Sequence, residues 1–532
     1  MYAQIARSVL LRRVRVSLGR AHIGVATCLL VSVSGSLSCR GAQSTPPPSP
    51  GPVVLRFGVA SPKTPDAAIG IRAFVNSFFS ETLVGTGADG KHYPRLASEW
   101  AWDNTNLTLK LKIRKNLKFQ DGTPVGNKYI KDELNEIFKN PTAVSYKSVI
   151  GIDTLDDNVV AIRLDRPEAL LLAELGNATI SIRDPKKTDV GLGAYRLLER
   201  GPRTRLAAFP EYYRGKPQID SIEIQEFEQQ RASWAALMRG QIDAVHEILP
   251  SALDFLKAEG QTNVRVFPFT RPFFIHLLFN VKHPVLKDPR VRQALSYAVD
   301  RQAIIDQGLD RQGVVSDGPI WPHHWAYSAA QKSYTRNVEA ATLRLDAAGF
   351  RPNKTRDAGH MPSRFRFKCL TLEKNATFER IALLVQKQLS EIGVDMEIET
   401  VSIDELGARS KTGNYDAILA ERISGRSLFW TYYVFHSSKL GAPYKAADRA
   451  LDQLRVSSDE STVRANVGDL QRIFFDDPPA IFIAWPRVAR VVSSKFVIPE
   501  DATAFDESVK RTTDAGQDVI TGIWKWHSAG TR

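Results

Sequence analysis

The sequence predicts a mixed α/β fold, and three local patterns support this prediction. Apolar and polar residues alternate strictly over residues 107–113, as they do in a strand with one solvated face. Residues 367–372 are typical of a strand, the segment after them has apolar residues at helical spacing, and a second alternating segment begins at Val394. Such a β-α-β succession is typical of a parallel sheet. Asp288 and Pro289 suit the cap and the first turn of a further helix.

The remaining elements are predicted in chain order. Residues 53–59 indicate the first buried strand, and Asp121-Gly122 a turn. Residues 159–164 indicate another strand, with a tight turn at residues 156–158 before it. The helix that starts at Pro289 has one apolar face, formed by Val291, Ala294, Leu295, Ala298 and Ile305. The helix of the β-α-β unit is marked by Phe378, Ile381, Val385, Leu389 and Ile392, and Gly393 ends it.

Length and composition indicate a globular protein of more than one domain. The 532 residues are 43% hydrophobic and 24% charged, and this length exceeds what one hydrophobic core usually serves. The formal charge is +13, and five of the arginines lie in the first 38 residues, which contain no acid. The other cations form no Lys/Arg run of the kind that follows a phosphate backbone, which argues against nucleic-acid binding. A basic surface would also suit an acidic ligand.

The N-terminal segment has the three parts of a secretory signal. A basic region extends to Arg20, an apolar region covers residues 23–33, and small residues follow, so we expect residues 1–38 to be a signal peptide. The alternative is an N-terminal membrane anchor, for which the apolar region is short. Cys39 stands where a lipoprotein carries its acylated cysteine. Ser38 fits that pattern, and Ser36 and Leu37 depart from it.

Residues 39–52 are rich in proline and predict an extended tether between Cys39 and the first strand. Cys369 is the only cysteine of the chain beyond this tether, so no internal disulfide framework is expected after cleavage of the signal.

No catalytic motif emerges from the sequence. Residues 85–90 match the dinucleotide fingerprint GxGxxG, but Pro94 stands where the helix of that motif should run, so a surface turn is expected. The sequence contains no Walker A loop, HExxH motif, paired CxxC or GxSxG elbow. His323 and His324 are adjacent, and neighbours in an extended chain point to opposite sides, so they would not chelate one metal together. We therefore expect no enzyme, no cofactor and no metal site.

Several segments, in order, resemble the peptide-binding (family 5) extracellular solute-binding proteins of ABC importers. The most specific is FNVKHPVLKDPRVRQALSYAVDRQAI at residues 279–304, which is similar to the family's strand, loop and helix. LTLKLKIRKNLKFQDGTPV at residues 107–125 and GLGAYRLLE at residues 191–199 resemble two further elements, the latter with Ala194 in place of a proline. The agreement extends to about Trp485.

The resemblance implies a two-lobed, periplasmic-binding-protein-like α/β clamp with an additional domain inserted in the N-terminal lobe. It places the N-terminal lobe at residues 53–270 with the insertion at about 99–189, the C-terminal lobe at 271–490, and a tail returning to the N-terminal lobe at 491–532. Such a receptor works outside the cytoplasm, closes on a solute between its lobes and delivers it to a membrane permease. It catalyses no reaction.

Three segments are the strongest candidates to meet the ligand, because they combine aromatic walls with a few polar groups. They are residues 271–276, 321–327 and 426–433. The expected contact residues, including one in the strand before the last segment, are Phe273, Phe274, His276, Trp321, Trp325, Arg422, Arg426, Trp430 and Tyr432. Peptide-binding relatives carry, near the position of Gly425, an aspartate that pairs with the amino terminus of the peptide. With arginines on both sides of that position instead, a peptide-like or anionic solute is expected, held by its acid group.

Two alternatives remain open. The first is a metal-chelate receptor of the nickel-binding type, for which His276, His323, His324 and His436 lie near the candidate segments. The second is a sensor or interaction clamp that does not transport. The expected partners are the solute, an ABC permease and the membrane through a lipid anchor, and the protein is expected to be a monomer.

Overall fold

The computed structural model describes residues 51–60, 70–139, 144–176, 190–248, 263–352, 363–438, 444–499 and 520–530. The predicted signal peptide, Cys39 and most of the tether lie outside these residues. The folded elements belong to one compact unit, Pro52–Arg532. None of the helices in the described ranges is both long enough and apolar enough to cross a bilayer.

The centre of the fold is a twelve-stranded mixed sheet in the order β16-β15-β17-β13-β18-β11-β1-β10-β9-β8, with β12 and β14 also paired to β18. We call the strands on the two sides of β18 the N-terminal and C-terminal half-sheets. The N-terminal half-sheet contains β1 (Val54–Val59), β8 (Tyr195–Glu199), β9 (Arg203–Ala208), β10 (Ser221–Glu226), β11 (Ala244–Ile248) and β12 (Val264–Thr270). The C-terminal half-sheet contains β13 (Phe273–Phe279), β14 (Gly313–Val315), β15 (Phe365–Leu372), β16 (Val394–Val401) and β17 (Ala417–Ile423).

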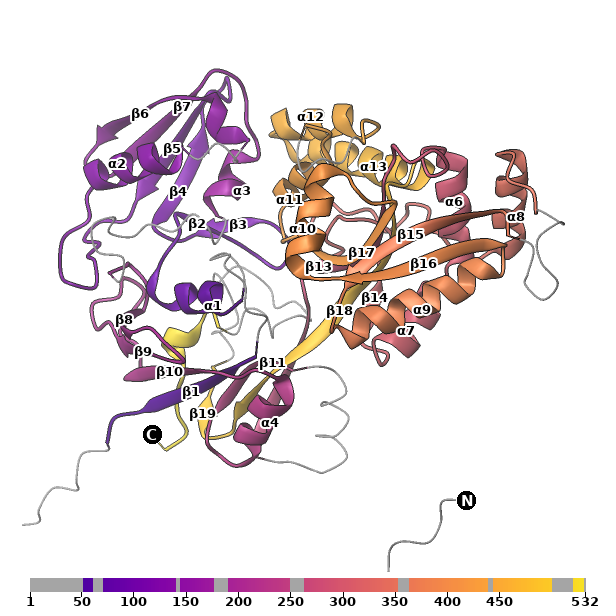
Figure 1. Cartoon of the computed structure of the whole chain (residues 1–532). Helices are drawn as coiled ribbons and strands as arrows, with labels where there is room; N and C mark the ends of the chain where they lie inside the picture. The colour runs from indigo at the N-terminus through magenta and orange to yellow at the C-terminus, as the bar shows by residue number, and fades with distance from the viewer. Residues whose placement is uncertain are drawn as a thin grey trace, which may run out of the picture. The chain divides into compact units, whose positions relative to one another are not determined.

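β18 (Ala480–Ser493) belongs to both halves and is visible as the long yellow strand in Figure 1. Residues 480–486 pair with β13 and β14, whereas residues 487–493 pair with β12 and β11. Pro486, which has no N–H to donate, stands where the strand passes from one half to the other. The second connection between the halves is the Arg271-Pro272 link between β12 and β13.

Helices cover both faces of the C-terminal half-sheet. One face packs against α6 (Pro289–Ala298), α7 (Arg301–Gly308), α8 (Val338–Ala347) and α9 (Ala376–Ser390). The other carries α10 (Ile403–Thr412), α11 (Leu428–Phe435), α12 (Asp448–Val456) and α13 (Glu460–Asp476). Alternate residues of β13 enter these two cores, Leu277 on one side and Leu278 on the other. This double burial explains why every residue of β13 except His276 is apolar.

The N-terminal half-sheet is covered by α1 (Gly70–Phe79) on one face and by α4 (Gln230–Met238) on the other. The described end of the chain joins the α1 side through η3 (Ile523–Lys525) and the two-stranded ribbon of β19 (Phe496–Val497) and β20 (His527–Ser528). Ile520, Ile523 and Trp526 are buried there with Phe57.

A separate antiparallel sheet follows α1 in the chain and is called here the inserted sheet. Its strand order is β4 (Ala97–Trp102), β5 (Thr108–Ile113), β7 (Val159–Leu164) and β6 (Val149–Asp156). It has its own core, to which α2 (Asn127–Ile137), η1 (Ser145–Ser148) and α3 (Leu171–Leu175) contribute. A two-stranded hairpin, β2 (Val84–Thr86) and β3 (His92–Pro94), precedes it.

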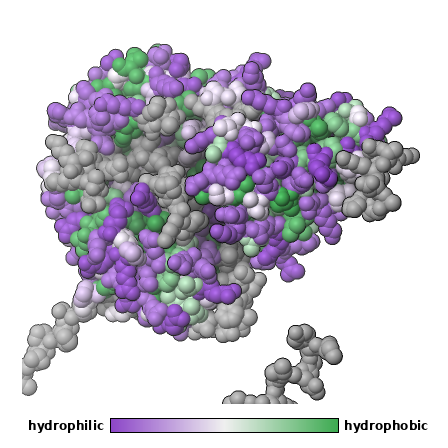
Figure 2. Space-filling view, viewed as in Figure 1, coloured by the Kyte–Doolittle hydropathy of each residue, from purple (hydrophilic) through white to green (hydrophobic). Residues whose placement is uncertain are grey.

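The face of the molecule drawn in Figure 2 is mostly hydrophilic, with apolar residues scattered in small groups. On the solvated side of the inserted sheet, charges pair across neighbouring strands. Lys112 lies 2.9 Å from Glu99, and Arg163 lies 2.6 Å from Asp153. Exposed pairs of this kind contribute about 0–1 kcal/mol each, so the stability of this sheet rests on its apolar face.

Most sequence predictions for single elements are confirmed. β1, β5 and β7 lie where predicted, and β15, α9 and β16 form the predicted parallel β-α-β unit. The Asp288 side chain caps α6 by accepting from the Arg290 N–H at 2.8 Å. The prediction of one continuous apolar face from Pro289 to Ile305 is wrong. The backbone becomes extended at Val299, and Asp300 caps a new helix, α7.

The burial of Trp526 gives a prediction for the tail. Replacing this fully buried side chain by alanine should lower the free energy of unfolding by about 3–5 kcal/mol, because it leaves a large cavity beside Phe57. The matched control is Trp524→Ala. Because Trp524 is only partly buried, its replacement should lower the free energy of unfolding by less. Urea denaturation measures both, and equal losses would contradict the packing described.

Candidate ligand-binding site

Parts of the three candidate segments meet at the adjoining ends of β13 and β17. The backbone N–H groups of Ser424 and Gly425 both donate to the Pro272 carbonyl, at 3.0 and 3.1 Å. The Ser424 hydroxyl donates to the Pro319 carbonyl at 2.7 Å, which brings the loop before Trp321 to the same place. The candidate site is therefore built on the β12–β13 link, next to the point where β18 changes halves.

An aromatic wall lies behind this meeting point. The ring of Trp485, on β18, lies 5.5 Å from Phe274 and 5.4 Å from Trp321, measured between centroids. Phe274, Trp321 and Tyr432 are buried in the core under α11–α13. These three predicted contact residues therefore form packing that supports the site from behind. Phe273 is only partly buried, and the Arg271 guanidinium lies 4.7 Å from its ring centroid.

His276 is fully buried on β13 and is held neutral. Burial, and then the positive charge of Arg422, lower the pKa of this imidazole to about 3. The backbone groups of Ala420 and Phe274 lie near enough to oppose the shift, but neither ring nitrogen makes a hydrogen bond of good geometry. His276 is thus a buried polar group with unused hydrogen-bonding capacity beside a cation.

Arg422 is the unusual cation of the site. It stands opposite Phe274 in the register of β17 and β13 and is only partly exposed. Burial lowers the pKa of its guanidinium, and Tyr415 opposes that shift. Within the described ranges no hydrogen bond or ion pair to the Arg422 side chain is found. A guanidinium has five N–H donors, and leaving them unpaired away from water is unfavourable.

Gly425 has no room for an acidic side chain. Its φ is +59°, in the left-handed region that favours glycine, and a Cβ atom there would lie 2.4 Å from Cδ1 of Trp430. An aspartate at this position would have to displace the Trp430 ring. The loop conformation therefore excludes an acidic side chain at this position, and Trp430 packs on the backbone of Gly425.

The other charged group of the site ties the two half-sheets together. Arg271 binds Glu421 of β17 at 3.0 Å and approaches Glu247 of β11 at 3.7 Å. Burial raises the pKa of Glu421, with Arg271 only partly opposing the shift, whereas the pKa of Glu247 is lowered because Arg271 and other cations outweigh the effect of burial. His246, beside Glu247, is kept neutral by burial and by Arg490.

The hairpin of β2 and β3 corrects one prediction. No helix follows residues 85–90, as expected, but the turn is not on the surface. The Trp321 indole N–H donates to the Ala88 carbonyl, and the Trp325 N–H donates to the Asp89 carbonyl, both at 2.8 Å. A Cβ atom on Gly90, where φ is +80°, would lie 2.3 Å from His324. The glycines let the hairpin tip approach the aromatic loop closely.

Trp325 and Arg426 lie against this hairpin. The cations of Lys91 and Arg464 lie 5.5 and 5.0 Å from the Trp325 ring centroid, a distance at which cation–π attraction operates. The Arg426 carbonyl faces Gly90. The structure thus separates Trp325 and Arg426, beside the hairpin, from His276 and Arg422, on the half-sheet.

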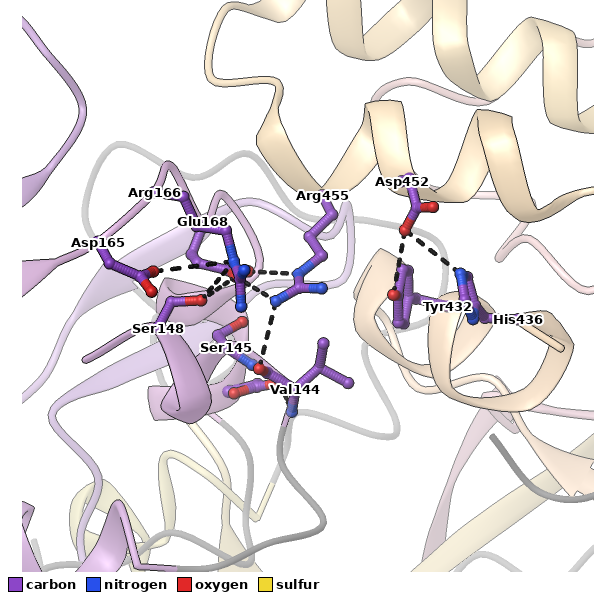
Figure 3. A network of polar contacts seen from close by, with 11 residues as sticks. Val144, Ser145, Ser148, Asp165, Arg166, Glu168, Tyr432, His436, Asp452 and Arg455 are labelled. Atoms are coloured by element: carbon purple, nitrogen blue, oxygen red, sulfur yellow. Dashed lines mark hydrogen bonds and ion pairs between the residues drawn. The ribbon is translucent and has the colours of Figure 1, made fainter. Parts of the chain in front are cut away.

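The Tyr432 side chain belongs to a polar network shown in Figure 3. Its hydroxyl donates to Asp452 on α12 at 3.2 Å, and His436, stacked on its ring at 4.6 Å, lies 3.3 Å from the same carboxylate. Figure 3 shows both side chains directed at Asp452. In the described part of the chain no three His, Cys, Asp or Glu side chains are arranged to hold a metal ion.

Sequence reasoning missed four features of the site: Glu247, Glu421, Trp485 and the hairpin tip. Glu421 and Arg422 break the apolar run of β17 next to each other, and this signal could have identified both. Glu247 and Trp485 carry no local signal, because their importance arises from the crossing of β18.

The comparisons with known proteins agree with this architecture. Residues 91–441 match the profile described as "Bacterial extracellular solute-binding proteins, family 5 Middle". This match covers more than half of the chain. The chain belongs to this family. It is a solute-binding protein of ABC import and works outside the cytoplasm, and the proteins of this family are not enzymes.

Individual relatives differ in what they bind. The oligopeptide-binding protein AppA of Bacillus subtilis (strain 168) is 26% identical over 443 residues, which cover 76% of this chain and 79% of the relative. NikZ from Campylobacter jejuni, in complex with Ni(L-His), has a TM-score of 0.72 at 21% identity, covering 89% of this chain and 99% of that one. AgaA from A. tumefaciens R10, in complex with agropinic acid, has a TM-score of 0.71 at 22% identity, covering 90% and 99%. The structural likenesses support the two-lobed binding-protein fold with its additional sheet.

The buried neutral His276 gives a pH prediction. The pKa of His276 in the folded protein lies below the value of 6.5 in the unfolded chain. Its contribution to the free energy of unfolding is therefore complete above pH 6.5 and is lost as the pH falls toward 3. Relative to His276→Leu, the wild type should lose about 2 kcal/mol of unfolding free energy between pH 7 and pH 5. Denaturation of both proteins at the two pH values measures this difference, and a difference independent of pH would contradict the assignment.

Proposed function

We propose that this family 5 receptor captures a small solute bearing an anionic group, which it holds between its lobes and delivers to an ABC permease. The observation that carries this proposal is the Arg422 guanidinium, which is largely withdrawn from water and has no hydrogen-bond or ion-pair partner in the described ranges. A carboxylate or phosphate of the solute would supply two parallel hydrogen bonds and the missing charge. His276 lies beside it and could donate a further bond from its neutral ring.

The same geometry argues against recognition of a peptide through its amino terminus. Gly425 occupies the place of the acid that peptide-binding relatives use, and Trp430 leaves no room for a side chain there. Glu421 and Glu247, the two carboxylates described at this site, are both paired with Arg271 already. A peptide-like ligand would therefore be held by its carboxylate. AgaA, solved with agropinic acid, is a precedent in this fold for an acidic solute that is not a peptide.

Ligand would act by favouring closure, since it can shift the balance of open and closed states only by its difference in affinity for them. The predicted contact residues divide into three groups under this proposal. His276 and Arg422, on one face of the C-terminal half-sheet, would touch the solute, and Trp325, Arg426 and Trp430 would border it from the loops. Phe273, on the opposite face of β13 with Arg271, would contact it only at the end of the strand.

We further propose the placement of the receptor at the membrane. Residues 1–38 would direct export, Cys39 would carry the lipid, and residues 39–52 would tether the folded unit, whose lobes would run over residues 53–270 and 271–490 with the tail at 491–532. Loss of membrane association in Cys39→Ala, with export retained, is the expected result of fractionating cells. Equal association of the variant would refute the anchor.

Ligand-dependent thermal unfolding tests the proposed solute class. A library of peptides, sugars, organic anions, phosphates and metal chelates should contain stabilising compounds only among those with an acid group. A ligand at one hundred times its Kd adds about 2.7 kcal/mol of stability. Arg422→Met should weaken binding of such a compound at least tenfold, whereas the control Arg351→Met, at an exposed arginine, should not.

Three outcomes would contradict the proposal. One such outcome is that a peptide with a blocked carboxyl end and a free amino end binds as well as the free acid. The receptor would then recognise peptides through their amino terminus. Undiminished binding in Arg422→Met would show that Arg422 is not the partner of the anionic group of the solute. Stabilisation by metal chelates alone would favour the nickel-type alternative.

A further inference from the structure

The region of the inserted sheet touches α12, one of the helices that cover the C-terminal half-sheet, and this contact has its own chemistry (Figure 3). Glu168, on the segment between β7 and α3, has a side chain that is completely buried. Both of its oxygens bind the guanidinium of Arg455 on α12, and the distance from Nε to Oε2 is 2.6 Å. Such a paired, two-point contact is the strongest form of ion pair between side chains.

The backbone reinforces the side chains at this contact. The Ala169 N–H donates to the carbonyl of Arg455 itself at 2.7 Å, so main chain and side chain of one residue are held together. Arg455 also donates to the Val144 carbonyl at 3.4 Å, and the Ser148 hydroxyl donates to Glu168 at 2.5 Å. Both Glu168 oxygens and two of the three Arg455 nitrogens are thus hydrogen-bonded, and Arg166 lies 3.4 Å from Glu168 as a second cation. Hydrogen bonding of this kind is what a buried ion pair needs to be favourable.

Apolar burial accompanies the ion pair. Val144 and Leu170 come from the inserted-sheet region, yet they are buried in the core of α11–α13, with exposed fractions of 3% and 5%. Among their neighbours in that core are Leu451 and Leu454 of α12. If the two parts separate, these side chains return to water, so the contact contributes to holding them together.

Two weaker contacts extend along the same side of α12 and α13. The Asn106 side chain donates to the Ser458 hydroxyl at 3.1 Å, and Lys91 pairs with Glu460 at 2.9 Å. Both pairs are exposed, so they add little energy but fix the orientation of the surfaces.

We propose that residues 168–170 and Arg455 form an interlobe latch, which holds the receptor closed through contacts of its own chain and releases when the lobes open. None of the latch residues is a predicted contact residue, although the Arg455 guanidinium lies 5.7 Å from the ring centroid of Tyr432. It would raise the closed fraction of the ligand-free receptor, and the apparent affinity for any solute that binds the closed state would rise in proportion to that fraction.

Hydrogen exchange of the Ala169 amide tests the latch directly, since that amide is bonded across the contact. The experiment uses the full-length protein without ligand and mass spectrometry at single-amide resolution. The amides of Leu111 in β5 and Leu277 in β13 report the cores of the inserted sheet and of the C-terminal half-sheet. In the wild type, Ala169 should be protected but should exchange faster than both, because opening exposes it without unfolding.

Arg455→Met keeps the aliphatic stem and removes the charge, and it should speed Ala169 exchange at least tenfold while leaving Leu111 and Leu277 unchanged. Arg449→Met, at an exposed arginine on the same helix, is the matched control and should change nothing. Glu168→Gln should speed Ala169 exchange at least as much as Arg455→Met, because it also weakens the contact of Glu168 with Arg166 at 3.4 Å. The double variant should add little to Glu168→Gln, because the Arg455 pair is already lost in it.

Two results would overturn the latch. Ala169 exchange as slow as that of Leu111 in the wild type would show a permanent interface that opens only on unfolding. Unchanged Ala169 exchange in both Arg455→Met and Glu168→Gln would show that the pair does not hold the contact. Neither readout involves a solute, so the latch and the proposed solute class can fail separately.

Discussion

The architecture depends on β18, because this one strand is hydrogen-bonded into both half-sheets. Its first seven residues complete the C-terminal half-sheet and its last seven complete the N-terminal one. Any relative motion of the halves must therefore be absorbed within a few residues, at Pro486 and at the Arg271-Pro272 link beside it. The candidate site lies at these connections, and binding there is mechanically linked to the angle between the halves.

The double burial of β13 and β17 explains the charges of the site. Strands covered by helices on both faces leave no solvated side for ionic groups, so a charge at the strand end needs a partner. Arg271, Glu421 and Glu247 satisfy one another across the two halves. Arg422, one residue along from Glu421, points to the opposite face and meets the neutral His276 instead. Arg422 thus differs from Arg271, which is paired with two carboxylates.

Local sequence patterns predicted the helices and strands well. They could not predict which residues far apart in the sequence come together in the fold. Asp288 and Pro289 marked the start of α6, but the break at Val299 was missed, although Asp300 after it is a residue type that caps helices. Pro94 excluded a dinucleotide site at residues 85–90, yet the close approach of Gly90 to His324 could not be foreseen. Arg422 could be selected because it lies close in sequence to Gly425, the position at which the resemblance implies an acid. The latch could not, since Glu168 and Arg455 are 287 positions apart.

We propose that Arg422 meets the anionic group of the natural solute. The most direct measurement is native mass spectrometry of the receptor purified from the cells that produce it, followed by extraction and identification of the retained small molecule. We expect a solute with at least one carboxylate or phosphate, carried by the wild type and absent from Arg422→Met. A neutral or cationic solute, or equal occupancy of the variant, would contradict it.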